Sequence, residues 1–318
     1  MKSVTKGFMP VRKMGFESQG KAIRLVSFGK LMLNRGMIIQ PIILALVFCL
    51  GAFSTSAATK VIDDIGMKVR FQKGLEGLVE GKDKKVTSLA ELNKQLNRKK
   101  AKIAIPEKKP SQFPPDEIYE RCKSSVLMIG RIYKCDKCTK WHVGSASGFA
   151  ITSDGIIATN YHVVENKDGA TLGAMDLFGK TYAVTEVLAA SKADDVAILR
   201  LKGAKLTPLP LAGEAAPVGS DVSVISHPDG RYFTMTKGDV SRYYLSRAKN
   251  VNAPRMAITA DYAKGSSGAP VLNSKGEVVG MVSATNSIYY NKERGQNQNL
   301  QMVIKSCIPV DAIRRLIR

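Results

Sequence analysis

The segment AKGSSGAPV, residues 263–271, contains a serine whose surroundings suit a nucleophile, although this composition is also typical of a tight surface turn. A serine hydroxyl becomes a strong nucleophile when a histidine takes its proton and a carboxylate holds that histidine in the correct tautomer. The chain has three histidines, His142, His162 and His227, and all of them precede Ser267. An α/β-hydrolase places its histidine last, so this order excludes that architecture and leaves the order His, Asp, Ser open.

His162 and Asp195 are the candidates for the base and the acid. His162 follows a strand-like stretch, GIIATN, at the point where the chain turns, which predicts an exposed position at a strand end. Asp195 directly precedes the apolar run VAILRL, which predicts a carboxylate at the start of a buried strand. The preceding residue, Asp194, is the alternative acid.

Two glycines, Gly265 and Gly268, flank the serine pair and allow the backbone to turn sharply. Such a turn can direct the backbone amides of Gly265 and Ser267 at an oxygen that becomes negatively charged when the hydroxyl attacks a carbonyl. Taken separately, each of these patterns is compatible with a structural role. Taken in the order histidine, aspartate, serine, they favour nucleophilic catalysis.

The segments that must position these residues are short apolar runs separated by turn residues. From about Asp116 onward, stretches such as SVLMIGRIY, YAVTEVLAA, DVAILRL and EVVGMVSA have the length and composition of strands, and SDG and SKG are typical of hairpin turns. The final stretch, VDAIRRLIR, has apolar residues at helical spacing. We predict an all-β domain with one or two closed barrels and a C-terminal helix.

Three blocks of the chain, SGFAITSDGIIATNYHVV, DDVAILRL and GSSGAPVLNSKGEVVGMVSA, resemble the catalytic blocks of trypsin-like serine peptidases of the chymotrypsin fold. The resemblance extends from about residue 120 to residue 318 and is strongest to bacterial HtrA-like proteases. It implies two six-stranded β-barrels with an active site in the cleft between them.

The resemblance also implies a role for each candidate residue. His162 would be the base, Asp195 the acid that orients it and Ser267 the nucleophile, with Gly265 and Ser267 forming the oxyanion hole. The family's acid is followed by an apolar residue and alanine, a pattern that favours Asp195 over Asp194.

Substrate-binding residues are implied at two positions. Asp261 lies six residues before the serine, where trypsin carries the charged base of its primary pocket. A buried Asp261 would select Lys or Arg, whereas an outward-turned Asp261, or one paired with Lys264, would leave a neutral pocket for small aliphatic residues. Ser283, Ala284 and Thr285 resemble the edge strand that binds the substrate peptide by strand addition.

The chain departs from the family at two points. Ser266 stands where relatives usually carry Asp or Asn, so activation by a newly cut N-terminus is not expected. The chain also stops soon after its terminal helix, so peptide sensing through a following PDZ domain is not expected. The stretch around His227 fits a loop that opens the second barrel, which favours a loop role for that residue over a second base.

The N-terminal part predicts export. Residues 1–58 are interpreted as a signal peptide with an extended n-region, because an apolar run from Met37 to Phe53 follows basic residues and precedes STSAA, which is typical of cleavage after Ala57 or Ala58. An uncleaved membrane anchor is the alternative, although the run is short for a membrane span. Residues 59–114 are interpreted as a charged lead-in with one short helix, marked by the capping box of Ser88 and Glu91, and a proline-rich linker that precedes a protease domain at 115–318.

The cysteines acquire a redox meaning if the protein is exported. Four remain after the signal segment: Cys122, Cys135, Cys138 and Cys307. Cys135 and Cys138 flank a two-residue turn, which favours a local disulfide. The alternative is a zinc site formed by these two cysteines, His142 and a fourth ligand such as Cys122.

The formal net charge of +21 is spread along the chain, because residues 1–58, 59–114 and 115–318 each carry +7. No zinc-finger spacing or aromatic RNA-binding run accompanies it, so nucleic-acid binding is not expected. We predict an exported serine endopeptidase that acts on polypeptides and requires no metal or organic cofactor for catalysis. The alternative is a chaperone-like envelope protein of protease fold that binds polypeptides with little turnover; the oligomeric state is not predicted.

Overall fold

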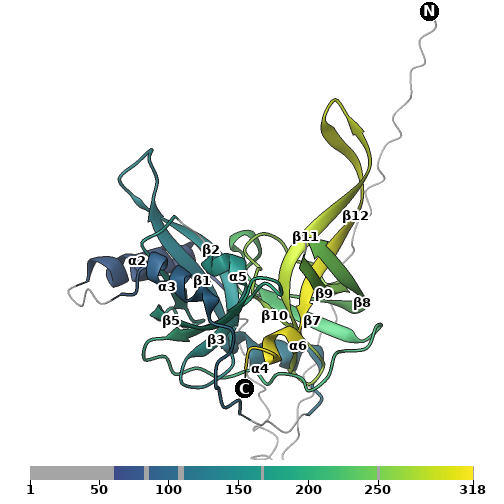
Figure 1. Cartoon of the computed structure of the whole chain (residues 1–318), viewed down its shortest axis with the longest axis horizontal. Helices are drawn as coiled ribbons and strands as arrows, with labels where there is room; N and C mark the ends of the chain where they lie inside the picture. The colour runs from purple at the N-terminus through teal and green to yellow at the C-terminus, as the bar shows by residue number, and fades with distance from the viewer. Residues whose placement is uncertain (1–60, 82–85, 107–110, 166–167, 249–250, 318) are drawn as a thin grey trace, which may run out of the picture. The chain divides into compact units, whose positions relative to one another are not determined.

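The described residues fold into two closed β-barrels of six antiparallel strands each, followed by a helix (Figure 1). The computed structural model describes residues 61–81, 86–106, 111–165, 168–248 and 251–317. The predicted signal segment in residues 1–58 lies outside them. The fold class predicted from the sequence, two six-stranded barrels with a C-terminal helix, is confirmed.

The first barrel has the ring order β1-β2-β3-β6-β5-β4, and β1 closes it by pairing with both β2 and β4. Its strands are β1 (Val126–Lys134), β2 (Trp141–Ala150), β3 (Ile156–Thr159), β4 (Thr171–Met175), β5 (Thr181–Ser191) and β6 (Val196–Leu201). The antiparallel register of β3 against β6 sets Thr159 opposite Ala197. The residues that follow β3 therefore meet the residues that precede β6 at one end of this barrel.

The second barrel has the ring order β10-β11-β12-β9-β8-β7. Its strands are β7 (Asp221–Ser226), β8 (Thr234–Ala248), β9 (Val251–Ile258), β10 (Pro270–Leu272), β11 (Val278–Glu293) and β12 (Gln296–Pro309). The β11–β12 ladder continues to the pair Glu293 and Gln296, whereas β12 pairs with β9 over only Lys305 to Cys307. The two strands therefore extend beyond the barrel as a long hairpin (Figure 1).

The helices are short apart from α2. Those of the described residues are α2 (Asp64–Glu80), α3 (Leu89–Lys94), η1 (Gln95–Asn97), α4 (Pro115–Cys122), η2 (Lys123–Ser125), α5 (Tyr161–Val164), η3 (Pro228–Gly230) and α6 (Val310–Arg314). The predicted capping box at α3 is confirmed, because Ser88 and Glu91 each accept from the other's backbone amide. No helix among the described residues is both long enough and apolar enough to cross a membrane.

Helix α2 packs directly against the first barrel, which the interpretation of this segment as a lead-in did not anticipate. Phe71 and Leu75 are fully buried in the core cluster that includes β1 and β4 residues. Glycines make room for them, because a Cβ atom at Gly130 would lie 2.6 Å from the Phe71 ring and one at Gly173 would lie 2.5 Å from Leu75. The helix is therefore part of the folded domain, and its burial supplies hydrophobic stabilisation that an isolated spacer would lack.

Candidate active site

His162 and Asp195 lie together at the end of the first barrel where β3 ends and β6 begins. His162 belongs to the short helix α5, and its Nδ1 is 3.0 Å from both carboxylate oxygens of Asp195. The His162 backbone amide donates to Asp195 Oδ1 at 3.1 Å. One carboxylate therefore holds both the backbone and the imidazole of the predicted base.

Asp195 is itself fixed by contacts from both barrels. Its backbone has a φ of 63°, which is unusual for a residue other than glycine, and the Asn160 side-chain amide donates to its carbonyl oxygen at 3.1 Å. From β11, the Ser283 hydroxyl donates to Asp195 Oδ2 at 2.7 Å. The carboxylate is only 17% exposed, while the His162 side chain is 48% exposed. The carboxylate is thus sheltered, whereas the imidazole is open to solvent.

Asp194, the alternative acid, is bound elsewhere. Its Oδ2 accepts from the Ser191 hydroxyl at 3.0 Å, and its Oδ1 accepts from Arg315 at 3.0 Å. Neither Ser191 nor Arg315 is a candidate catalytic residue, whereas Asp195 contacts the His162 imidazole directly. The geometry therefore favours Asp195 as the partner of His162.

Ser267 lies in the loop between β9 and β10, on the second barrel. Its hydroxyl donates to the Ser283 carbonyl oxygen at 3.4 Å, and both Ser267 and His162 line one pocket. Gly268 has a φ of 88°, and a Cβ atom there would lie 2.2 Å from the Ser147 carbonyl oxygen. Only glycine permits so close an approach between this loop and β2.

The backbone hydrogen bonds around Ser267 differ from residue to residue. Gly265 has a φ of 97°, and its carbonyl oxygen accepts from the Ser147 hydroxyl at 2.9 Å. The amides of Ser266 and Gly268 donate to carbonyl oxygens, whereas among the described residues no acceptor takes the amide protons of Gly265 or Ser267. Both residues line the pocket that His162 also lines, and the oxyanion role of their amides stays a prediction.

Ser283, Ala284 and Thr285, the predicted substrate-binding residues, lie on β11 at a break in its register with β12. The ladder passes from the pair Val282 and Cys307 directly to the pair Ala284 and Ser306, so Ser283 is bulged out of it. Ala284 and Thr285 are exposed, and Ser283 is half-buried. The bulge leaves Ser283 beside Asp195 and Ser267, at the edge that strand addition would use.

Asp261 does not form the buried base of a charged pocket; of the two alternatives that the sequence left open, the structure shows the outward-turned one. Its side chain is 83% exposed, and Oδ1 forms an ion pair with Lys305 Nζ at 3.0 Å. Lys305 also donates to the Tyr262 carbonyl oxygen at 2.9 Å. The aspartate turns outward, and its partner is Lys305 rather than Lys264.

Two further polar residues beside the Ser267 loop are buried. The Ser266 hydroxyl donates to the Ser226 hydroxyl at 3.0 Å, so a neutral pair occupies this position. His227 lies in the loop after β7, as predicted, and is fully buried; its Nδ1 accepts from the Phe233 amide at 3.0 Å. Burial lowers the pKa of His227 from 6.5 to about 4, which keeps this imidazole neutral near neutral pH.

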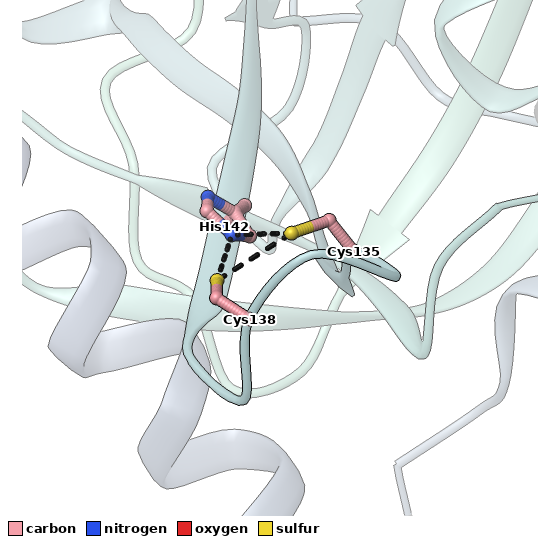
Figure 2. A group of neighbouring side chains, drawn as sticks. All are labelled: Cys135, Cys138 and His142. Carbon is pink, nitrogen blue, oxygen red and sulfur yellow. Dashed lines mark hydrogen bonds between the residues drawn. The ribbon is translucent and has the colours of Figure 1, made fainter.

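The expected disulfide between Cys135 and Cys138 is not formed in this structure. Their sulfur atoms are 3.4 Å apart, and His142 Nε2 lies 3.2 Å from Cys135 Sγ and 3.0 Å from Cys138 Sγ (Figure 2). The pKa of the Cys135 thiol is lowered, mainly because the Lys137 backbone amide donates a hydrogen bond to its sulfur. Cys122 is buried beside Gly276, outside this group of three.

Sequence reasoning missed three residues that support the site: Ser147, Asn160 and Lys305. Asn160 and Ser147 belong to the block that contains His162, but nothing in the block distinguishes a positioning residue from a strand residue. Lys305 lies on β12, far from the Ser267 loop in sequence, and only the barrel topology brings it to Asp261.

The chain matches a known family model and is similar to several curated proteins. Residues 146–281 match the family model described as a trypsin-like peptidase domain. The chain is 32% identical over 166 residues to a "Probable periplasmic serine endoprotease DegP-like" of Halomonas elongata; the matched segment covers 52% of this chain and 32% of that protein. It is 35% identical over 148 residues to "Protease Do-like 1, chloroplastic" of Arabidopsis thaliana, which covers 44% of this chain and 33% of that protein.

The chain thus matches about a third of the length of these curated relatives. Among solved structures, the active form of the Rv3671c protease from M. tuberculosis has a TM-score of 0.50 at 23% identity, covering 67% of this chain and 92% of that one. At this identity the likeness supports the fold alone.

Burial of His227 predicts that the protein loses stability in mild acid. The unfolded chain takes up a proton near pH 6.5 and the folded protein only near pH 4, so the unfolded state is favoured as the pH falls through this window. We expect a loss of up to about 3 kcal/mol in the free energy of unfolding, measured by urea denaturation from about pH 7 to about pH 4.

His227→Asn removes the titrating group and should flatten this dependence. Phe233→Leu is the matched control, because the Phe233 ring packs against His227 at 4.7 Å and its loss costs packing while the imidazole stays. The control should keep the wild-type slope at lower overall stability. Equal slopes in wild type and His227→Asn would contradict the assignment.

Proposed function

We propose that this chain, which carries a trypsin-like peptidase domain, is a serine endopeptidase that cleaves polypeptides through an acyl-enzyme intermediate. The observation that carries the proposal is the 3.0 Å contact between His162 Nδ1 and the Asp195 carboxylate, in a pocket that Ser267 also lines. This arrangement leaves Nε2 of the imidazole as the atom that can take the serine proton.

In the proposed mechanism Ser267 Oγ attacks the carbonyl carbon of the scissile bond while His162 Nε2 takes its proton. Asp195 stabilises the imidazolium that results, and the amides of Gly265 and Ser267 bind the oxyanion of the tetrahedral intermediate. His162 then gives the proton to the leaving amine, whose bond to the carbonyl carbon breaks. Water, activated by the same imidazole, hydrolyses the acyl-enzyme and restores the serine.

Positioning of the substrate is assigned to β11. A peptide that adds as a strand beside Ser283, Ala284 and Thr285 would lie next to Ser267, because the Ser283 carbonyl oxygen already contacts the Ser267 hydroxyl. Ser283 would act as a positioning residue as well, since its own hydroxyl holds Asp195.

Export is the second part of the proposal. The run from Met37 to Phe53 is typical of a signal peptide with cleavage at Ala57 or Ala58, and the relative from Halomonas elongata is described as periplasmic. We place the folded domain in the periplasm or outside the cell, where unfolded or accessible polypeptides would be its substrates.

The test of the proposal is covalent labelling with a fluorophosphonate. Wild-type protein should take one label, and Ser267→Ala should take none. Asp195→Asn should slow labelling by on the order of 10⁴, because the imidazole then adopts the wrong tautomer. Asp194→Asn is the matched control, since that carboxylate binds Ser191 and Arg315 instead, and its labelling rate should stay near wild type.

A wild-type chain that never labels would support the alternative of a polypeptide-binding protein of protease fold. Slow labelling of Asp194→Asn, together with normal labelling of Asp195→Asn, would show that the acid has been misassigned.

The exposed position of Asp261 predicts that this residue does not select basic substrates. A buried unpaired charge would discriminate strongly for Lys or Arg, but Asp261 is already paired with Lys305 and largely in solvent. We expect cleavage mainly after small aliphatic residues in a mixed peptide library, with the same profile for Asp261→Ser. Asp221→Ser, at an exposed acid of β7, is the control. A strong Lys or Arg preference that Asp261→Ser abolishes would refute this prediction.

A further inference from the structure

Three potential metal ligands meet at the tip of the β1–β2 hairpin (Figure 2). Cys135 and Cys138 lie in the turn that connects the strands, and His142 is the second residue of β2. The two sulfur atoms and His142 Nε2 lie within 3.0 to 3.4 Å of one another. Each donor atom faces the same small space, although the residues come from both sides of the turn.

This geometry is close to that of a tetrahedral zinc site. With Zn–S bonds of about 2.3 Å and Zn–N bonds of about 2.0 Å, two ligand atoms in a tetrahedral site are separated by roughly 3.5 to 3.8 Å. The observed separations are smaller by only a few tenths of an ångström. A metal ion could therefore be accommodated by a small outward movement of side chains, without rearrangement of the hairpin.

We propose that Cys135, Cys138 and His142 bind one Zn²⁺, with the fourth position open to water. Two thiolates and an imidazole are the donor set that zinc prefers, whereas Mg²⁺ and Ca²⁺ prefer oxygen ligands. On binding, each thiol releases its proton to solvent as its sulfur replaces a water molecule of the hydrated ion. Cys138 is exposed, so the ion has an entry path.

The spacing in the sequence agrees with the proposal. Two cysteines separated by two residues are followed by a histidine four positions later, so a single tight turn can provide all three ligands. Tyr133 of β1 lies opposite His142 in the antiparallel register, and its ring is 5.5 Å from the imidazole between centroids, tilted by 32°. Cys122, which the sequence offered as a fourth ligand, is buried beside Gly276 and does not belong to the group.

The proposed zinc site lies next to strand residues that line the pocket of His162 and Ser267. Directly below the tip, Tyr133 and the residues Val143 to Ala146 line the same pocket as His162 and Ser267. From the other side, Gln72 and Glu80 of α2 hydrogen-bond to Trp141 at 3.1 and 2.7 Å. A metal ion that joins the ends of β1 and β2 would reduce the separation of these two strands at their tip. It would therefore make the part of the pocket wall that they form more rigid.

The experiment is a Co²⁺ titration of the full chain, reduced and freed of metal, followed by displacement with Zn²⁺. The protein used is Ser267→Ala, so the result does not depend on turnover or on the proposed peptidase activity. We expect one Co²⁺ per chain, with thiolate-to-cobalt charge-transfer absorption and the visible bands of tetrahedral Co²⁺, and complete loss of both on addition of one equivalent of Zn²⁺.

Ligand variants should weaken binding strongly. Cys138→Ser and His142→Ala should each reduce Zn²⁺ affinity by more than about 100-fold. Loss of a residue that only hydrogen-bonds to a metal ligand already costs up to about 100-fold, and loss of the ligand itself should cost more. Lys137→Ala is the matched control, because it lies between the two cysteines in the same turn and offers no ligand to the group; its affinity should be unchanged. Hydrogen exchange of the β1–β2 hairpin should slow when Zn²⁺ binds, and the ligand variants should not show this effect.

Three results would overturn the proposal. The first is absence of stoichiometric metal binding by protein whose thiols are shown to be reduced. The second is equal affinity in the ligand variants and in Lys137→Ala, which would indicate adventitious binding. The third is a Cys135–Cys138 disulfide, found by non-reducing peptide mapping, that reductant cannot open under native conditions.

Discussion

The carboxylate of Asp195 is the point on which the arrangement of the site depends. It accepts hydrogen bonds from the His162 imidazole and backbone on the first barrel and from Ser283 on the second. A φ of 63° directs this side chain out of the turn between β5 and β6, and Asn160 holds that turn by its carbonyl oxygen. One aspartate therefore joins three segments that are far apart in sequence, two on the first barrel and one on the second.

The Ser267 loop is held against the first barrel in a complementary way. Ser147 of β2 donates its backbone amide to the Ser267 carbonyl oxygen at 2.8 Å and its hydroxyl to the Gly265 carbonyl oxygen at 2.9 Å. Both bonds occupy carbonyl oxygens, and no acceptor among the described residues takes the amide protons of Gly265 or Ser267. Close approach at Gly268 makes the contact possible. Catalytic preorganisation in the proposed mechanism thus comes from hydrogen bonds that also join the barrels.

Much of the fold could be predicted from local patterns, and the failures have physical reasons. Local patterns do not predict strand β4, because TLGAM is short and contains a glycine. Around β8 they predict only a loop and a hairpin that open the second barrel, because TMTKGDVSRYY is polar where the strand reaches solvent. Helix α2 was missed because its glycines and charges hide the apolar positions Phe71 and Leu75. The sequence identified His162, Asp195 and Ser267 as candidates, but it left the direction of the Asp261 side chain open, because its partner, Lys305, is set by long-range pairing.

The tautomer of His162 is the measurement that tests the account most directly. The chain has only three histidines, so nitrogen-15 NMR of histidine-labelled protein can be assigned with single substitutions. If Asp195 orients the imidazole, neutral His162 carries its proton on Nδ1, with a strongly hydrogen-bonded, downfield proton signal that Asp195→Asn removes and Asp194→Asn keeps. A neutral His162 protonated on Nε2 in the wild-type protein would contradict the account.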